Sequence, residues 1–385
     1  MKMAGQWRQL FAQCTYPTLF LSWEWVFAWW QNFRGTTVAE TGSRQLRLYA
    51  IYSDQGDSSE LIGLIPMYLA RPSNSILPCR HLRLFGDLGG HGEGLTEETL
   101  LLTKRFHEAE VVATFLKTVT KARDWDFLTL NYAKPQEVLQ VPAPDTAPRL
   151  SLTGSGIEQR LSFGTEILRL PADRDTYRRS LSKSMRDNLA YYPRLLTRHG
   201  YDWKVRAVTE HSEMNAAVRE LVELHRHRAE LADRVRHTNH VPEPCHLQCL
   251  QQMFSQLATR CAASVWLLEI EGKAIAALAL LDSPSMRTVY YTGYDPAFNA
   301  YSPLTILNAE AIYDAIANRI PCINFLAGTD RWTARWGTKP EVLFEQVTVQ
   351  RLRPQSLLRS ALYRGRQYRN RVQSESPTPS HPRKP

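Results

Sequence analysis

The sequence lacks a long apolar segment. No run reaches the roughly 20 apolar residues that a membrane-spanning helix needs, which excludes a helical membrane protein. Residues 1–10 contain no long apolar stretch and no small-residue cleavage site, so they do not resemble a secretory signal peptide. We therefore expect a cytoplasmic protein.

Cysteine is also scarce, with six residues in 385, and their spacing forms no disulfide framework. Cys245 and Cys249 lie near His240 and His246 in the chain. These residue types bind zinc, but there is no paired Cys-x-x-Cys motif and prolines interrupt the segment. Buried thiols in a loop are the alternative, and we predict no metal site.

Acidic residues are in the minority, and the net charge is +9. The excess is local, because residues 351–385 contain nine Lys or Arg and one acid, Glu375. The rest of the chain is nearly neutral, which argues against a basic groove, and we expect no specific nucleic-acid partner. The tail is either a solubilising end or a weak contact with an anionic membrane surface or nucleic acid.

A chain of 385 residues with 43% hydrophobic and 22% charged residues fits two folded domains. In the second half, three strands with a tight turn at Glu271-Gly272 precede a helix and a buried strand. These predicted elements are residues 265–270, 274–281, 288–294, 304–316 and 322–326. Their order is β-β-β-α-β.

The first half repeats this order more loosely. Its predicted elements are residues 46–52, 61–70, 81–85, 106–121 and 125–130. Residues 141–156, rich in Pro, Ser, Thr and Gly, are typical of a linker. A helix is predicted at 174–199, and its row of cationic side chains faces either solvent or a cleft.

These patterns predict an α/β (α+β) fold, in which each lobe has a mixed, mainly antiparallel twisted sheet flanked by helices. The predicted boundaries are 1–150 for an N-terminal lobe, 151–350 for a linker helix and a C-terminal lobe, and 351–385 for a basic, largely disordered tail.

Residues 290–310 carry the clearest signal for ligand binding. Ser302-Pro303 is a strong helix start, since Ser favours the N-cap and Pro the first helical position. The free N–H groups of such a first turn bind phosphate. The edge of the preceding strand, beside Gly293, suits an extended ligand arm. Together these features predict coenzyme A, which carries a pyrophosphate and a pantetheine arm.

Longer motifs around this segment resemble a known family. GYDPAFNAYSP, the strand CINFLAG and residues 328–337 are similar to the C-terminal signature of cellulose-biosynthesis-type (CelD/BcsL-like) GNAT acetyltransferases. These are relatives of the Fem-type double-GNAT proteins. The likeness includes SWEW, LIGLIPMYL, LSKSMRDNLAYYPRLLTRHG and ELVELHRHRAE, so it covers residues 7–350. Residues 329–333 depart from the pattern: Thr333 replaces the usual lysine, and Asp330 is the single acid.

The resemblance implies tandem GNAT-like lobes and acyl transfer from acetyl-CoA or another acyl-CoA by direct attack, without a metal. Attack by an amine on the thioester needs a base that accepts the amine proton, a hydrogen-bond donor to the oxyanion, and an acid that protonates the leaving thiolate. Asp330 is the candidate base, or else it pairs with an arginine. Tyr294 and Tyr291 are the candidate hydrogen-bond donors to the thiolate or the oxyanion, or else core or edge tyrosines. Arg335 orients Asp330 or binds an acyl or phosphate oxygen, or else is structural.

We expect acyl-CoA to bind at Tyr291, Ser302, Pro303, Leu304 and Thr305. We expect the acceptor substrate to bind at Arg186, His225, Arg228 and Trp332. His225 is also an alternative base, because an unperturbed histidine titrates near pH 6.5. A cluster of tryptophans is either the core of the first lobe or a platform for stacking on sugar. Its members are Trp23, Trp25, Trp29 and Trp30.

We therefore predict an N-acyltransferase for a small polar or sugar-derived acceptor, as in polysaccharide biosynthesis. Two other functions fit the same fold: a tRNA-dependent aminoacyl transferase of the Fem type, and a non-catalytic scaffold of a polysaccharide pathway. The nearly neutral body argues against tRNA, whereas the changed 329–333 motif keeps the scaffold open. No motif predicts an oligomeric state.

Overall fold

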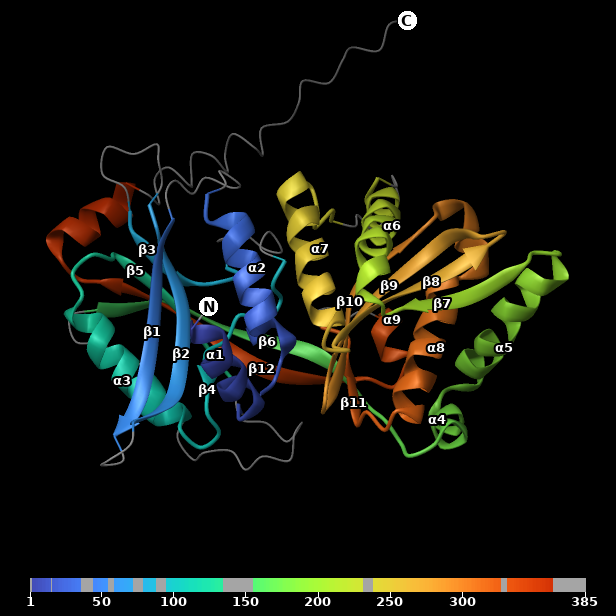
Figure 1. Ribbon diagram of the computed structural model, residues 1–385, viewed down its shortest axis with the longest axis horizontal. Helices are drawn as coiled ribbons and strands as arrows, with labels where there is room; N and C mark the ends of the chain where they lie inside the picture. The colour runs from blue at the N-terminus through green and yellow to red at the C-terminus, as the bar shows by residue number, and fades with distance from the viewer. Residues whose placement is uncertain are drawn as a thin grey trace, which may run out of the picture.

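The computed structural model describes residues 2–14, 16–35, 44–54, 59–71, 79–87, 95–133, 155–230, 238–326 and 331–362, which form two lobes side by side (Figure 1). The first lobe contains α1 (Lys2–Ala12), η1 (Leu19–Leu21), α2 (Trp23–Phe33), β1 (Arg44–Asp54), β2 (Ser59–Ala70), β3 (His81–Leu84), β4 (Leu102–Thr103), α3 (Glu108–Lys121) and β5 (Phe127–Ala133). No helix in these ranges is long and apolar enough to span a bilayer.

The second lobe contains β6 (Ser155–Arg169), α4 (Arg174–Ser180), α5 (Lys183–Arg198), β7 (Trp203–Val208), α6 (His211–Ala229), α7 (Pro244–Ala258), β8 (Ala263–Ile270), β9 (Lys273–Ser283), β10 (Met286–Tyr294), η3 (Pro296–Tyr301), α8 (Pro303–Ala317), β11 (Cys322–Asn324) and α9 (Arg331–Ala334). The last strand, β12 (Lys339–Arg351), runs back to the first lobe and pairs with β5.

The repeated β-β-β-α-β order predicted from the sequence is confirmed, except that the first lobe has an additional short strand, β4, between β3 and α3. In the first lobe, β1, β2 and β3 form an antiparallel meander, α3 follows, and β5 pairs with β3 in parallel. In the second lobe, β8, β9 and β10 form the meander, α8 follows, and β11 pairs with β10 in parallel. Turn and helix-start residues at particular positions determine this order of elements. Glu271 and Gly272 both have positive φ in the β8–β9 turn, and Pro303 begins α8.

Two long strands that the sequence analysis does not predict join the lobes. β6 and β12 pair with each other along most of their length, and β6 also pairs with β11. One 12-stranded sheet therefore runs through the described part of the molecule (Figure 1). A second difference concerns the helix predicted at 174–199. It is two helices, α4 and α5, because the chain is extended at Leu181 and Ser182, where the Ser182 hydroxyl caps the Met185 amide.

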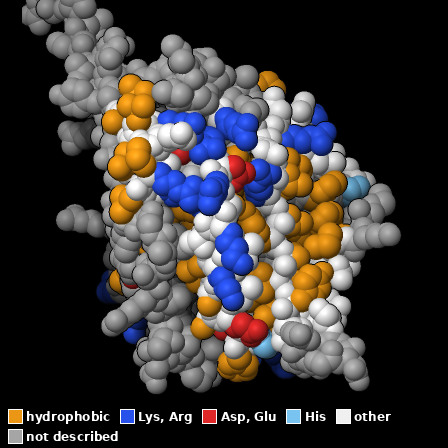
Figure 2. Space-filling view, turned by 90° about the vertical axis from the view of Figure 1, so that its left-hand side faces the viewer, with side chains coloured by type: hydrophobic (Ala, Val, Ile, Leu, Met, Phe, Trp, Pro, Cys, Tyr) orange, Lys and Arg blue, Asp and Glu red, His pale blue; other side chains and the backbone are white. Residues whose placement is uncertain are grey.

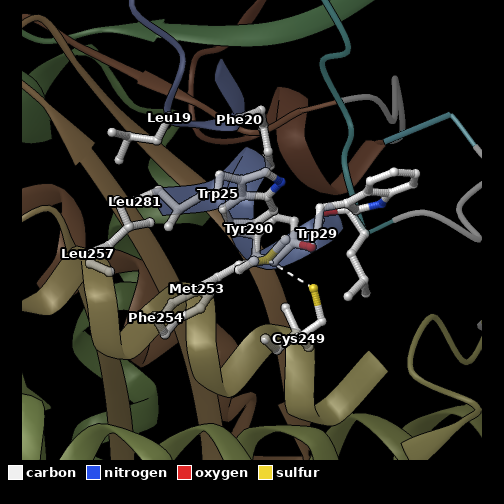
Figure 3. Close-up of a cluster of buried hydrophobic side chains, with 14 of the residues drawn as sticks. Leu19, Phe20, Trp25, Trp29, Cys249, Met253, Phe254, Leu257, Leu281 and Tyr290 are labelled. Carbon is white, nitrogen blue, oxygen red and sulfur yellow. Dashed lines mark hydrogen bonds between the residues drawn. The ribbon is translucent and has the colours of Figure 1, made fainter. Parts of the chain in front are cut away.

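The lobes also share a hydrophobic core, in which α2 of the first lobe packs beside α7 of the second (Figures 1 and 3). Trp25 and Trp29 are 1% and 0% exposed, and Trp25 lies edge-on to Tyr290 of β10 with ring centroids 5.4 Å apart. These two tryptophans therefore have no free face for stacking on a sugar. They form part of a core that both lobes need.

Candidate active site

Strands β10 and β11 separate after a short parallel contact. Their last paired residues are Thr288 and Asn324, and β11 ends there. β10 continues to Tyr294 and has a bulge between Val289 and Thr292 where it pairs with β9. In the described part of the chain, the outer edge at the end of β10 therefore has no strand partner. Such an edge offers backbone N–H and C=O groups to an extended ligand.

The open edge of β10 leads through η3 to the N-terminus of α8. Ser302 is left-handed, with φ of 47°, and its side chain makes no capping hydrogen bond to a helix amide. Its hydroxyl instead lies 2.8 Å from the Thr305 hydroxyl. The sequence thus predicted the start of α8, but not this left-handed conformation. The first turn keeps its positive dipole end without a side-chain cap, as an anion site requires.

Arg335 brings a positive charge to the first turn of α8. Its Nη2 atom is 3.5 Å from the Thr305 hydroxyl oxygen, and its guanidinium carbon is 5.5 Å from the centre of the Trp332 ring. Three side chains predicted from the sequence therefore meet, although they come from α8 and from the segment that contains α9. Asp330, the predicted base, lies outside the described residues.

His225 has a supporting role in the structure. Its Nδ1 atom is 2.9 Å from the Thr292 carbonyl oxygen, and its Nε2 atom accepts a hydrogen bond from the His240 amide at 3.3 Å. Burial lowers the pKa of His225 by more than the hydrogen bond to the Thr292 carbonyl raises it. Both ring nitrogens are used in the neutral form, so we revise His225 from a substrate contact or base to a residue that holds α6 against β10.

The close packing of α6 on β10 explains Gly293. A Cβ atom at this position would lie 2.3 Å from the backbone nitrogen of His225, well inside van der Waals contact. Arg228 of α6 reinforces the contact by donating to the Thr292 hydroxyl at 2.9 Å, and its guanidinium lies 5.7 Å from the Tyr294 ring centre. The glycine therefore allows the helix to approach one face of β10 and is not a sign of a loose strand.

Tyr291 offers a buried hydroxyl beside the bulge. It is 6% exposed and stacks between Tyr290 and the rings of His225 and His240. Its hydroxyl makes no hydrogen bond of normal length and angle among the described residues, although the Tyr290 hydroxyl is close enough to lower its pKa. Burial raises the pKa of Tyr291 far above its ordinary value, so the hydroxyl stays protonated and can donate a hydrogen bond.

Arg186 lies apart from the other predicted acceptor residues. It belongs to α5, which packs against α8 and η3, and its guanidinium donates to the Leu181 carbonyl. His225 and Arg228 belong to α6, on the opposite face of the sheet (Figure 1). The four predicted acceptor residues, Arg186, His225, Arg228 and Trp332, therefore do not converge on one point.

The first lobe supplies two acids that the sequence analysis missed. Glu98 accepts hydrogen bonds from the side-chain amide of Asn324 at 2.8 Å and from the Tyr16 hydroxyl at 3.2 Å. Its carboxylate therefore lies where β11 ends. Glu97, beside it, is close enough for its charge to raise the pKa of Tyr291. The nearby Leu95 carbonyl accepts the Tyr290 hydroxyl at 2.5 Å. The signal in the sequence is a glycine-rich run, GDLGGHGEG, just before these residues.

Three of the four residues considered for zinc, Cys245, His246 and Cys249, belong to the packing of α7. Cys249 is buried and contacts the Met253 sulfur at 3.8 Å, and Cys245 Sγ is 3.7 Å from His246 Nδ1. His246 is fully buried, edge-on to Phe33. No group of three or more potential metal ligands occurs among the residues that the structure describes.

Comparison with known proteins identifies the second lobe. Residues 183–333, from α5 to α9, match the family model described as an acetyltransferase (GNAT) domain. The second lobe is a GNAT domain. The protein is therefore an acyltransferase of the GNAT type, and the open edge of β10 and the start of α8 both lie inside its GNAT domain. No curated protein sequence matches the chain.

Solved structures extend the likeness to both lobes. The crystal structure of FemX is 10% identical, with a TM-score of 0.57 over 89% of this chain and 95% of that one. At this identity the match shows a shared two-lobed fold. A C-terminal domain of a putative lysylphosphatidylglycerol synthetase from Agrobacterium fabrum is 11% identical, with a TM-score of 0.49 over 94% of each chain. A tandem GNAT protein from the clavulanic acid pathway is 13% identical, with a TM-score of 0.44 over 90% of this chain and 94% of that one.

Proposed function

We propose that the protein is an N-acyltransferase that moves an acyl group, in the simplest case acetyl, from acyl-CoA to an amine of a small polar or sugar-derived acceptor. The observation that carries this proposal is the continuous path from the open edge of β10 to the uncapped start of α8 within the GNAT domain. The strand edge suits an extended pantetheine arm, and the helix start suits the pyrophosphate.

The acceptor would approach β10 from the side of the first lobe, where Glu97 lies beside Tyr291. Burial raises the pKa of the Glu97 carboxyl, and the charge of His240 lowers it by a smaller amount. A carboxylate with a raised pKa is a better proton acceptor from an amine. We assign the base to Glu97, and Asp330 remains the alternative predicted from the sequence.

The transfer then follows direct attack. The amine nitrogen bonds to the thioester carbon, its proton passes to the carboxylate, and the C–S bond of the tetrahedral intermediate breaks. Tyr291 is the proposed hydrogen-bond donor to the oxyanion, since its hydroxyl is protonated and makes no hydrogen bond of normal length and angle among the described residues. Tyr294, at the end of β10, is the proposed proton donor to the leaving CoA thiolate.

The branch of the GNAT family and the pathway in which the protein acts are also part of this proposal. The motif GYDPAFNAYSP, which spans the end of β10, η3 and the start of α8, favours the cellulose-biosynthesis-type branch. An acceptor from a polysaccharide pathway and a cytoplasmic location, where acyl-CoA is made, are consistent with that branch.

Arg335→Gln tests the donor site. We expect it to weaken acetyl-CoA binding by about 10- to 100-fold, because a hydrogen bond between a guanidinium and a phosphate is worth about 1.5–3 kcal/mol. Binding of S-acetyl-pantetheine, which lacks the pyrophosphate, should not change. Isothermal titration with both ligands measures the difference, and Arg335→Lys is the matched control that keeps the charge. Equal losses for both ligands, or no acetyl-CoA binding by the wild type, would contradict the proposal.

A further inference from the structure

The short helix that follows β12 has its polar side chains inside and its leucines outside. Residues 354–362 are helical. Ser356 and Ser360 are 3% and 1% exposed, whereas Leu357, Leu358 and Leu362 are 45%, 54% and 51% exposed. A surface helix normally buries its apolar stripe. The reversed orientation therefore requires an anchor on the polar side.

That anchor is Asp126, whose carboxylate is fully buried at the start of β5. Ser356 donates to it at 2.7 Å, Arg80 donates at 3.2 Å, and Arg359 of the helix lies at 3.4 Å. Burial raises the pKa of Asp126, but the hydrogen bonds from Arg80 and Ser356 lower it by more, so the carboxylate stays charged. These contacts fix the helix on the first lobe with its leucines facing solvent.

Positive charge lies beside the exposed leucines. Arg353 precedes the helix and is exposed, and Arg359 lies within it. Figure 2 shows Lys and Arg side chains gathered on this end of the molecule, with hydrophobic side chains beside them and few acids. Leu352, next to the helix, is 56% exposed and extends the apolar surface.

We propose that this end of the first lobe docks on an anionic membrane surface. Leu357, Leu358 and Leu362 enter the interface between headgroups and acyl chains, and the Lys and Arg side chains on this face, Arg353 among them, contact lipid phosphates. Anionic bilayers bind helices that carry leucines on one side and have arginines beside them. A nucleic acid would match the charge but leave the leucines exposed to water. A second copy would match the leucines but bring like charges together.

Vesicle co-sedimentation of the full-length protein tests the proposal. We expect binding to vesicles of phosphatidylcholine and phosphatidylglycerol at 70:30, weakened by added salt, and little binding to phosphatidylcholine alone. The double variant Leu357→Ser/Leu358→Ser should lower the partition coefficient at least about tenfold, because it removes most of the apolar contact. Its thermal unfolding should match that of the wild type, since both side chains are exposed.

Tyr191→Ser is the matched control, because Tyr191 is 48% exposed on α5 in the other lobe, and this variant should bind vesicles like the wild type. Three results would overturn the proposal. The first is the absence of binding to either vesicle, and the second is binding that the leucine variant does not change. The third is equal competition by a DNA duplex against vesicle binding of the variant and the wild type, because the surface would then recognise anionic polymers through charge alone.

Discussion

Replacing Glu97 with glutamine is expected to lower kcat/KM for acyl transfer by about 100- to 10,000-fold, the usual contribution of a general base. Glutamine keeps the shape of the side chain but cannot accept the amine proton. Glu97 lies on the first lobe and not in the GNAT domain, so acetyl-CoA affinity should stay at its wild-type value. Release of the CoA thiol, with glucosamine as a model sugar amine, measures the rate.

The pH profile separates a base from a merely structural acid. Glu97 accepts a proton only as the carboxylate, and burial raises its pKa above the ordinary value of 4.5. The wild-type rate should therefore rise with pH through this raised pKa and then level off. Glu97→Gln should lose that rise. If Glu97→Gln keeps both the rate and the rise while Asp330→Asn loses them, the base is Asp330.

Trp25→Ala is expected to lower the free energy of unfolding by about 3–5 kcal/mol, as for other large aromatic residues removed from a core. Trp25 is 1% exposed, lies edge-on to Phe20 and Tyr290, and donates through Nε1 to the Thr96 hydroxyl at 3.0 Å. Since these contacts join both lobes, we expect the two lobes to unfold in a single transition, at a lower denaturant concentration than in the wild type. Chemical denaturation followed by circular dichroism measures the loss.

Trp203→Ala provides the comparison for that experiment. Trp203 lies on the edge strand β7, is half-buried, and donates to the Thr197 hydroxyl within the same lobe. We expect a smaller loss of stability, about 1 kcal/mol, which is typical of a substitution outside the core. Two separate unfolding transitions in the wild type, with Trp25→Ala shifting only one of them, would contradict a core shared by the lobes.

The sequence predicted the parts of the fold that local signals determine. The turn at Glu271-Gly272, the helix start at Pro303 and the alternating apolar strands each depend on neighbouring residues. β6 and β12 were missed because their partners are far away in the chain; residue 347, for example, pairs with residues 130 and 160. Pairing between distant segments leaves no local mark on a sequence.

In the candidate site, too, the sequence predicted the features that depend on neighbouring residues and not those that depend on packing between distant segments. The start of α8 was predicted, since Ser302-Pro303 is a local signal. Thr305 and Arg335 were proposed from two separate segments of the sequence, and the structure brings their side chains to 3.5 Å. Glu97 was not predicted, because about 190 residues separate it from β10 and only the packing of the lobes brings them together. The sequence proposes His225 as a substrate contact and, because its ring can titrate, as an alternative base, but its backbone partners become visible only with the packing of α6 on β10.

Hydrogen exchange with and without acetyl-CoA locates the donor site, because it reports which backbone amides the bound acetyl-CoA covers. We expect slower exchange at residues 289–294 of β10 and in the first turn of α8, with no change in α3, which occupies the matching position in the first lobe. Protection confined to α3 and β3, or no protection at saturating acetyl-CoA, would contradict a donor site in the second lobe.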